Sequence, residues 1–256
     1  MKKLLQNIIR YINISLFKKN LPEKISIYFH EINEAEIKSI LEIINYFSEL
    51  DYKFVTTEYF EKNIHNDEKL FNFTFDDAFA SWIDILEIFK NNNVKATFYL
   101  NTIQFTEENQ EKFMRDIRIE DKSKLLTKDN LLKIKSFGHE IGAHTHSHLT
   151  LSNLNKDKFE NEVLKNLEHL RSLDINPKSF AIPFGMRRYM LESQKNFLMN
   201  NFVVICYGEP GMQFNQTKKI IQRTPWKSEK SFRYNITNLR TDTSLFNNLT
   251  KRSGLG

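Results

Sequence analysis

Two short segments that lie far apart in the sequence carry the residue types that bind divalent metals. The first is Thr74-Phe75-Asp76-Asp77 and the second is His144-Thr145-His146-Ser147-His148. Together they supply one carboxylate and two imidazole nitrogens to an ion, and a second carboxylate stays beside it. Three protein ligands with an open position are typical of catalytic zinc-type sites rather than of closed structural ones. The pattern therefore predicts a metal-dependent hydrolase.

The spacing within each segment is compatible with a common site. His144 and His148 are four residues apart, so on a helical turn both rings face the same side. Neutral imidazole suits zinc, cobalt, nickel or iron, and a carboxylate completes the ligand set. Asp76 and Asp77 would point in opposite directions within a strand, but a turn after the strand can aim both side chains into one site.

Each segment also has an ordinary interpretation. Paired aspartates after a strand often form a solvated turn or cap a helix N-terminus, and a histidine-rich loop is often only polar surface. Because both segments follow strands of the same alternating pattern, the pair together favours a metal site.

Apolar runs and helical periodicity alternate along the chain from residue 25 onward. Strands are predicted at 25–29, 70–75, 95–100, 140–143, 179–182 and 202–207, and the intervening helices include 34–50, 82–91, 127–137, 159–170 and 188–200. Strands separated by helices indicate a parallel sheet with crossover connections, here an α/β fold that forms a distorted or incomplete (β/α) barrel. Active sites of such barrels lie at the C-terminal ends of the strands, where His30, Asp76, Asp77 and the histidine segment are all expected.

Composition excludes several classes of protein. The 256 residues are 40% hydrophobic and 27% charged, which is a globular profile that fits one α/β domain. The net charge of +5 is spread along the chain, so no nucleic-acid-binding arm is expected. The single cysteine, Cys206, excludes an internal disulfide and lies in an apolar run, which favours a buried and unreactive thiol.

The two ends of the chain and one internal stretch differ from the rest. Residues 1–24 form a basic segment whose apolar residues recur at helical spacing, so it is either an interfacial membrane helix or a helix on the domain's own surface. It lacks the features of a signal peptide and is too polar to span a bilayer. Residues 25–226 are expected to form the catalytic domain, residues 101–126 an insertion or long loop, and residues 227–256 a peripheral or partly disordered tail.

Three motifs in a fixed order resemble a known family. They are Thr74-Phe75-Asp76-Asp77, the segment from Gly138 to His148, and Ala181-Ile182-Pro183-Phe184-Gly185. Together they resemble the first three motifs of the polysaccharide deacetylases, the NodB-homology group or carbohydrate esterase family 4. Tyr28-Phe29-His30 is also similar to the first strand of the poly-N-acetylglucosamine deacetylase subgroup. The resemblance covers about Ile25 to Trp226 and implies a distorted (β/α) barrel that removes acetyl groups from sugars with a divalent metal, zinc before cobalt, nickel or iron.

The resemblance also implies roles for single residues. Asp77, His144 and His148 would bind the metal and Asp76 would be the general base. The metal would polarise the amide carbonyl and activate a water, and the backbone N–H of Phe184 would stabilise the oxyanion, because Pro183 has no N–H.

The chain departs from the family pattern at three positions. No histidine occurs after His169, so the late histidine that usually serves as the acid is missing, and His30 becomes the candidate acid. Ala78 replaces a common glycine. Ala181 replaces an arginine that braces the base in many members, and Arg223 is the preferred substitute, with Arg187 as the alternative.

Three functional hypotheses follow. The first is metal-dependent removal of an N-acetyl group from an amino sugar in a bacterial cell-surface glycan or its precursor. This would occur in the cytoplasm, with peripheral contact to the inner face of the membrane through residues 1–20 as an option. The second is an amidohydrolase or deformylase that acts on a small-molecule amide. The third is a non-catalytic deacetylase-like domain. The sequence does not define the sugar or the oligomeric state.

Overall fold

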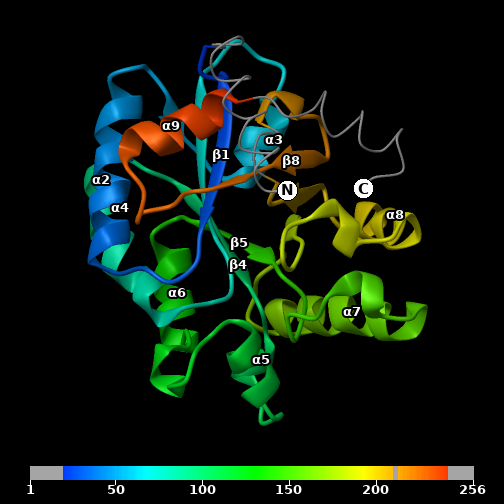
Figure 1. The fold of residues 1–256 in the computed structure, drawn as a ribbon. Helices are drawn as coiled ribbons and strands as arrows, with labels where there is room; N and C mark the ends of the chain where they lie inside the picture. The colour runs from blue at the N-terminus through cyan, green and yellow to red at the C-terminus, as the bar shows by residue number, and fades with distance from the viewer. Residues whose placement is uncertain (1–19, 210–212, 242–256) are drawn as a thin grey trace, which may run out of the picture.

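The fold is an α/β barrel (Figure 1), seen in a computed structural model that describes residues 20–209 and 213–241. The strands are β1 (Lys24–Phe29), β2 (Lys53–Phe54), β3 (Leu70–Phe75), β4 (Ala96–Leu100), β5 (Glu140–Ala143), β6 (Ser179–Ala181), β7 (Val204–Tyr207), β8 (Ile220–Gln222) and β9 (Thr224–Pro225). The α-helices are α2 (Glu34–Ser48), α3 (Thr57–Lys62), α4 (Leu86–Asn91), α5 (Glu111–Asp116), α6 (Lys128–Ser136), α7 (Lys156–Ser172), α8 (Glu192–Asn201) and α9 (Phe232–Arg240). Short 3₁₀ helices lie at Ala80–Ile85, Ile103–Phe105, Lys122–Lys124, Leu151–Asn153, Arg187–Tyr189 and Gln213–Asn215.

All strand pairs of this sheet are parallel, in the order β8-β7-β6-β5-β4-β3-β1-β9, and β2 adds to β3. The two ends of this order belong to one extended segment of chain. Its first part, β8, pairs with β7, and its second part, β9, pairs with β1; Arg223 is the single residue between them. The segment therefore bridges the gap between β7 and β1, and the sheet becomes a nearly closed barrel, as the sequence predicts.

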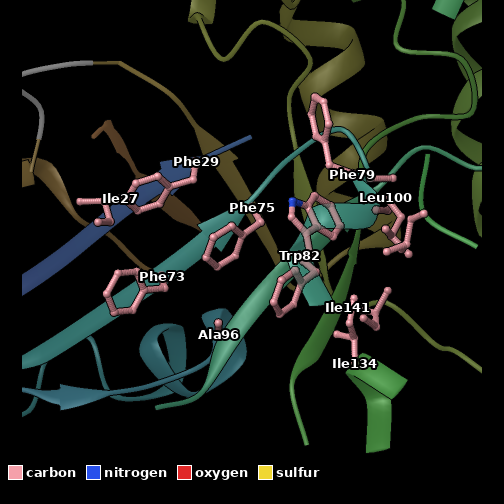
Figure 2. Close-up of a cluster of buried hydrophobic side chains, with 14 of the residues drawn as sticks. Ile27, Phe29, Phe73, Phe75, Phe79, Trp82, Ala96, Leu100, Ile134 and Ile141 are labelled. Atoms are coloured by element: carbon pink, nitrogen blue, oxygen red, sulfur yellow. The ribbon is translucent and has the colours of Figure 1, made fainter. Parts of the chain in front are cut away.

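Strand β3 carries polar side chains on the face toward the barrel interior and aromatic rings on the face toward the helices. Its residues alternate, so Phe71, Phe73 and Phe75 face the helices. Figure 2 shows Phe73 and Phe75 beside Ile27 and Phe29 of β1, and the rings of Phe29 and Phe75 stack at 5.8 Å between centroids. Burial of each such ring contributes roughly 1.5–3 kcal/mol. The other face of β3 carries Asn72 and Thr74 into the barrel, and Asp76 follows in the same alternation.

The helices begin where local sequence signals place them. Asn33 caps α2 with a capping box that includes Glu36, and Thr127 caps α6 in the same way. Figure 1 shows α2 and α9 on the same side of the barrel, and the rings of Tyr46 and Phe232 meet at 5.1 Å. The expectation of a peripheral tail is therefore wrong for α9, because Leu239 of this helix is fully buried in the core.

Two other expectations need correction. Residues 101–126 are not a plain loop, because they contain α5 and two 3₁₀ helices, and Phe113 of α5 is 1% exposed. The predicted helix over 82–91 is a 3₁₀ helix up to Ile85 and an α-helix only from Leu86. The predicted amphipathic segment of residues 1–20 and the end of the predicted tail, residues 242–256, lie outside the described residues. Within the described ranges, no helix combines the length and the apolar character that a membrane crossing requires.

Candidate active site

The two aspartates leave β3 in different directions because the backbone turns between them. Asp76 continues the inward face of β3 and its N–H donates to the carbonyl of Phe29 on β1 at 3.0 Å. Asp77 and Ala78 then adopt φ angles of +79° and +59°, in the left-handed region that residues with a Cβ rarely occupy. The turn brings the second carboxylate back toward the barrel mouth, so both side chains reach the same end of the barrel. Both are buried.

The histidine segment is held in place by the strand before it and by the neighbouring loop. The N–H of His144 donates to the carbonyl of Leu100 at 3.1 Å and so continues the pairing of β5 with β4. The amide of Asn101 donates to the carbonyls of His144 and Thr145. Both Thr145 and His148 have positive φ angles, +65° and +58°, and the His148 N–H donates to the hydroxyl of Thr145 at 3.1 Å. This turn brings the ring of His148 to 5.1 Å from that of His144.

Asp77, His144 and His148 converge in a way that fits a divalent cation. One ligand atom from each lies within 4.8 Å of the others, and all three residues are buried. The Nδ1 of His144 is 2.8 Å from the carbonyl oxygen of Ala181, which can only accept, so Nδ1 carries the proton and Nε2 of the neutral ring has a lone pair. That Nε2 is 3.2 Å from Oδ1 of Asp77, and so is Nε2 of His148.

The close approach of the Asp77 carboxylate to both histidine rings would be unfavourable without a positive charge between them. Oδ1 of Asp77 is buried and makes no well-aligned hydrogen bond, although both rings are within 3.2 Å. Lone pairs that face each other at this distance repel, whereas a cation between them is coordinated by all three. The Ala181 carbonyl fixes the tautomer of His144, as second-sphere groups do for metal-binding histidines.

The electrostatics of Asp77 agree with a charged carboxylate. Burial alone would raise its pKa, but positive charge at the position of the imidazoles, first that of His148, outweighs burial and holds the pKa of Asp77 well below its usual value. The low pKa favours the ionised carboxylate, the form that a metal ligand must have.

Asp76 is engaged separately, by a buried arginine. The guanidinium of Arg223 donates to both carboxylate oxygens of Asp76, at 2.7 and 2.8 Å, and donates also to the hydroxyl of Thr74 at 3.0 Å. The arginine side chain is fully buried. This two-pronged pairing fixes the carboxylate plane, which a lysine could not do. Arg187, the alternative in the sequence analysis, forms an ion pair with Glu209 instead.

Two tyrosines flank the guanidinium of Arg223. Its carbon lies 5.0 Å from the ring centroid of Tyr28 and 5.1 Å from that of Tyr99. The ring of Tyr99 fits only because residue 142 on β5 is glycine, since a Cβ there would lie 2.3 Å from the tyrosine ring. Burial lowers the pKa of Arg223, but the Asp76 carboxylate raises it further, and the net shift is upward, so the guanidinium stays charged.

His30 lies at the edge of the site, on the residue after β1. Its Nε2 is 3.7 Å from Oδ2 of Asp77, and half of its side chain, 51%, is exposed to solvent. The buried Trp82 donates its indole N–H to the carbonyl of His30 at 2.8 Å, which anchors the backbone after β1. The ring also meets Tyr28 edge-on at 5.5 Å.

Phe184 lies in a tight turn after β6, beside His148. The carbonyl of Ile182 accepts from the N–H of Gly185 at 2.9 Å, Pro183 is at the second position, and Phe184 has a φ of +60° at the third, an arrangement of the type II kind. Glycine normally occupies that third position, so the backbone at Phe184 is strained. The turn holds the Phe184 N–H in a fixed orientation. The Phe184 ring packs on His148 at 4.6 Å.

The structure thus brings all seven residues of the predicted site to one end of the barrel, in contact either with one another or with the metal-type cluster. His146 points away from the cluster, with its Nδ1 at 2.9 Å from the Thr102 hydroxyl. Sequence reasoning assigned no role to Tyr99 or Trp82. No local sequence motif identifies either residue. Their roles follow only from the structure, where Tyr99 on β4 and Trp82 in the 3₁₀ helix Ala80–Ile85 lie next to the site.

Comparisons with known proteins identify the family of this chain. The family model for polysaccharide deacetylases matches residues 63–198, more than half of the chain. The chain therefore belongs to the polysaccharide deacetylase family, the NodB-homology group of carbohydrate esterase family 4. Assignment to the poly-N-acetylglucosamine deacetylase subgroup stays a prediction.

Two curated relatives are peptidoglycan-N-acetylglucosamine deacetylases of Bacillus cereus. One is 33% identical over 123 residues, which are 47% of this chain and 37% of the relative. The other is 29% identical over 131 residues, 50% of this chain and 53% of the relative. The match thus spans between about a third and a half of these relatives' length. The solved structure of the deacetylase PplD of Streptococcus pyogenes, in complex with acetate, shares the fold with a TM-score of 0.63 and 18% identity, over 86% of this chain and 99% of that one.

Proposed function

We propose that this protein hydrolyses the N-acetyl group of an amino sugar in a glycan and that a divalent ion, zinc in the first place, is held by Asp77, His144 and His148. The observation that carries the proposal is the convergence of three buried ligand atoms beside a second, separately held carboxylate, Asp76. Membership of the deacetylase family and the two curated relatives support the same chemistry.

The ion, when bound, would act as a Lewis acid toward the acetyl carbonyl and toward water. Asp77 supplies the charge that retains it, and the Ala181 carbonyl holds His144 in the tautomer that can bind it. The remaining residues handle protons and the developing negative charge.

Asp76 acts as the general base. Its carboxylate accepts a proton from the attacking water, while Arg223 keeps the carboxylate oriented through two hydrogen bonds. The oxygen of water bonds to the acetyl carbon, and the N–H of Phe184 donates to the oxyanion that forms. The C–N bond then breaks, and the nitrogen takes a proton from His30, so the products are acetate and the free amine of the sugar. The exposure of His30 lets its ring recover a proton from solvent.

The test is acetate release from N-acetylglucosamine oligomers by purified protein loaded with zinc. Asp76→Asn is expected to lower kcat by at least about 100-fold, the range of a general base, and to bind the ion as the wild type does. Asp77→Ala is expected to lose both the activity and the ion, measured by elemental analysis. Asp157→Asn, an exposed aspartate on α7, is the matched control and should retain full activity.

Two outcomes would contradict the proposal. One is a folded, zinc-loaded protein that releases no acetate from any N-acetylated sugar. The other is an Asp76→Asn variant with wild-type kcat, because no other described carboxylate in the site is free to take the proton. Parallel assays with formyl and cyclic amide substrates separate this activity from that of the other amide hydrolases.

A further inference from the structure

Phe184 begins a row of side-chain contacts that starts at His148 of the metal-type cluster and ends at an exposed arginine, Arg188. The side chain of Phe184 is among the exposed large hydrophobic groups, at 45%, although its ring packs on His148. The turn that carries it is locked against the loop after β7, because Gly208 donates to the carbonyl of Gly185 at 2.6 Å, and a Cβ on Gly185 would lie 2.9 Å from the Cα of Gly208. An apolar ring in the open at a fixed place beside a site is a candidate contact for a ligand.

The next members of the row come from the 3₁₀ helix Arg187–Tyr189. The ring of Tyr189 meets that of Phe184 edge-on, with 6.0 Å between centroids. The guanidinium of Arg188 lies 4.9 Å from the centroid of the Tyr189 ring and donates to its hydroxyl at 3.0 Å. Consecutive contacts of 4.6, 6.0 and 4.9 Å thus connect the ring of His148 to the guanidinium of Arg188.

The two arginines of this helix differ in their partners. Arg187 pairs with Glu209 through Nε at 3.2 Å and covers the ring of Tyr207 at 5.4 Å, so its charge is already matched. Arg188 is exposed and has no carboxylate within ion-pair distance in residues 20–209 and 213–241. Contact with the Tyr189 ring and hydroxyl restrains its side chain, so less entropy is lost when it binds a ligand. Its fork of donors matches a carboxylate or a phosphate.

We propose that Phe184, Tyr189 and Arg188 form a second binding position next to the metal centre, where the rings contact a neighbouring sugar and Arg188 binds an oxyanion on it. The substrate is then an anionic glycan in which a carboxylate or a phosphate lies near the N-acetylated sugar. This inference rests on the proposed deacetylase function. A sugar ring offers apolar C–H groups to an aromatic ring, and the arginine adds the charge selectivity that aromatic contacts lack.

The experiment compares three oligosaccharides of equal length that carry N-acetylglucosamine: one neutral, one with a carboxylate and one with a phosphate on the adjacent sugar. The wild type is expected to show a higher kcat/KM on at least one of the charged forms, through a lower KM. Arg188→Gln should reduce the ratio of charged to neutral kcat/KM about tenfold, the value of one charge-assisted hydrogen bond. Arg188→Lys should fall between the two, since it keeps the charge but loses the fork.

Arg171→Gln on α7 is the matched control, because Arg171 is also exposed and has no ion pair with a described carboxylate. It should leave the ratio unchanged. Added salt should lower the wild-type preference for charged substrates, as expected for an exposed charge. The two charged substrates distinguish a carboxylate-bearing glycan from a phosphate-bearing one.

The inference is overturned if the active wild type does not discriminate between charged and neutral forms, or if Arg188→Gln lowers all three kcat/KM values by the same factor; either result leaves the deacetylase function intact. If no substrate releases acetate, the affinity of the protein for the charged oligosaccharides, measured by calorimetry, tests the second binding position. Binding that weakens about tenfold in Arg188→Gln supports the second binding position even then, and equal binding by both proteins refutes it.

Discussion

Replacement of Arg223 by methionine tests the central electrostatic feature of the site. Methionine retains much of the length of the side chain but removes the charge and the three hydrogen bonds to Asp76 and Thr74. Asp76 then remains 4% exposed without its counter-charge. Removal of one partner from a buried ion pair costs about 3–5 kcal/mol, mostly because the other charge is left uncompensated. We expect Arg223→Met to lose that much unfolding free energy and to lower kcat sharply.

The magnitude is measured by urea denaturation followed by circular dichroism, alongside Arg171→Met as an exposed control that should change stability by less than about 0.5 kcal/mol. Arg223→Lys should lie between Arg223→Met and the wild type, because one ammonium cannot satisfy both oxygens of Asp76.

A double-mutant cycle measures the interaction energy between Arg223 and Asp76 separately from their contacts with other residues. If the guanidinium and the carboxylate interact as the geometry indicates, Asp76→Asn combined with Arg223→Met costs less than the sum of the two single changes, with a coupling of about 1–3 kcal/mol. Additive losses, or a single Arg223→Met loss below about 1 kcal/mol, would refute the reasoning, since a buried two-pronged pair cannot be that weakly coupled.

Three further predictions follow from other parts of the structure. Removal of the divalent ion by a chelator should abolish acetate release and lower the melting temperature, and zinc should restore both; a chelated protein with full activity would contradict the assigned ligands. Burial lowers the pKa of His139 from 6.5 to about 4, and the charge of Lys95 adds to this, so the unfolded state binds the proton first and stability falls as pH drops from about 6.5 to 4. At 1.36 kcal/mol per pH unit this loss is about 3 kcal/mol. Urea denaturation at several pH values should show a pH dependence that is smaller by this amount in His139→Asn than in the wild type, and the remaining dependence includes His146, whose pKa burial also lowers to about 4. Trp82→Phe removes the donor to the carbonyl of His30 and should cost about 1–3 kcal/mol with a lower kcat, whereas unchanged kcat would separate Trp82 from the site.

The sequence allowed good prediction of elements whose signal is local. Strand β3 and helix α6 depend on signals from neighbouring residues, and both lie where the sequence predicts them, at 70–75 and within 127–137. The metal-type cluster was predictable for a related reason, because each motif directly follows a strand and parallel strands end at one rim.

Elements that depend on distant partners were harder to predict. Helix α5 is only six residues long, and Phe113 is buried by packing that no local pattern reveals. Helix α9 has apolar residues at Phe232, Ile236 and Leu239, spacing that fits a helix, but the segment is short and otherwise polar. Its stability comes from contact with α2 and the core rather than from propensity.

Arg223 shows how barrel closure and site assembly depend on one another. Position 181 holds alanine where the family pattern has an arginine, so this strand provides no cation next to His144. The positive charge beside Asp76 must therefore come from elsewhere in the barrel. Only a residue that faces the barrel interior can reach Asp76. Arg223 does so because it connects β8 to β9. Strand β8 pairs with β7, and β9 pairs with β1. The Arg223 N–H bonds to the carbonyl of Tyr207 on one side, while its side chain crosses to β3 on the other. A change that separates the β8–β9 segment from either neighbour would therefore also deprive Asp76 of its partner, so closure of the barrel and orientation of the base are one structural event.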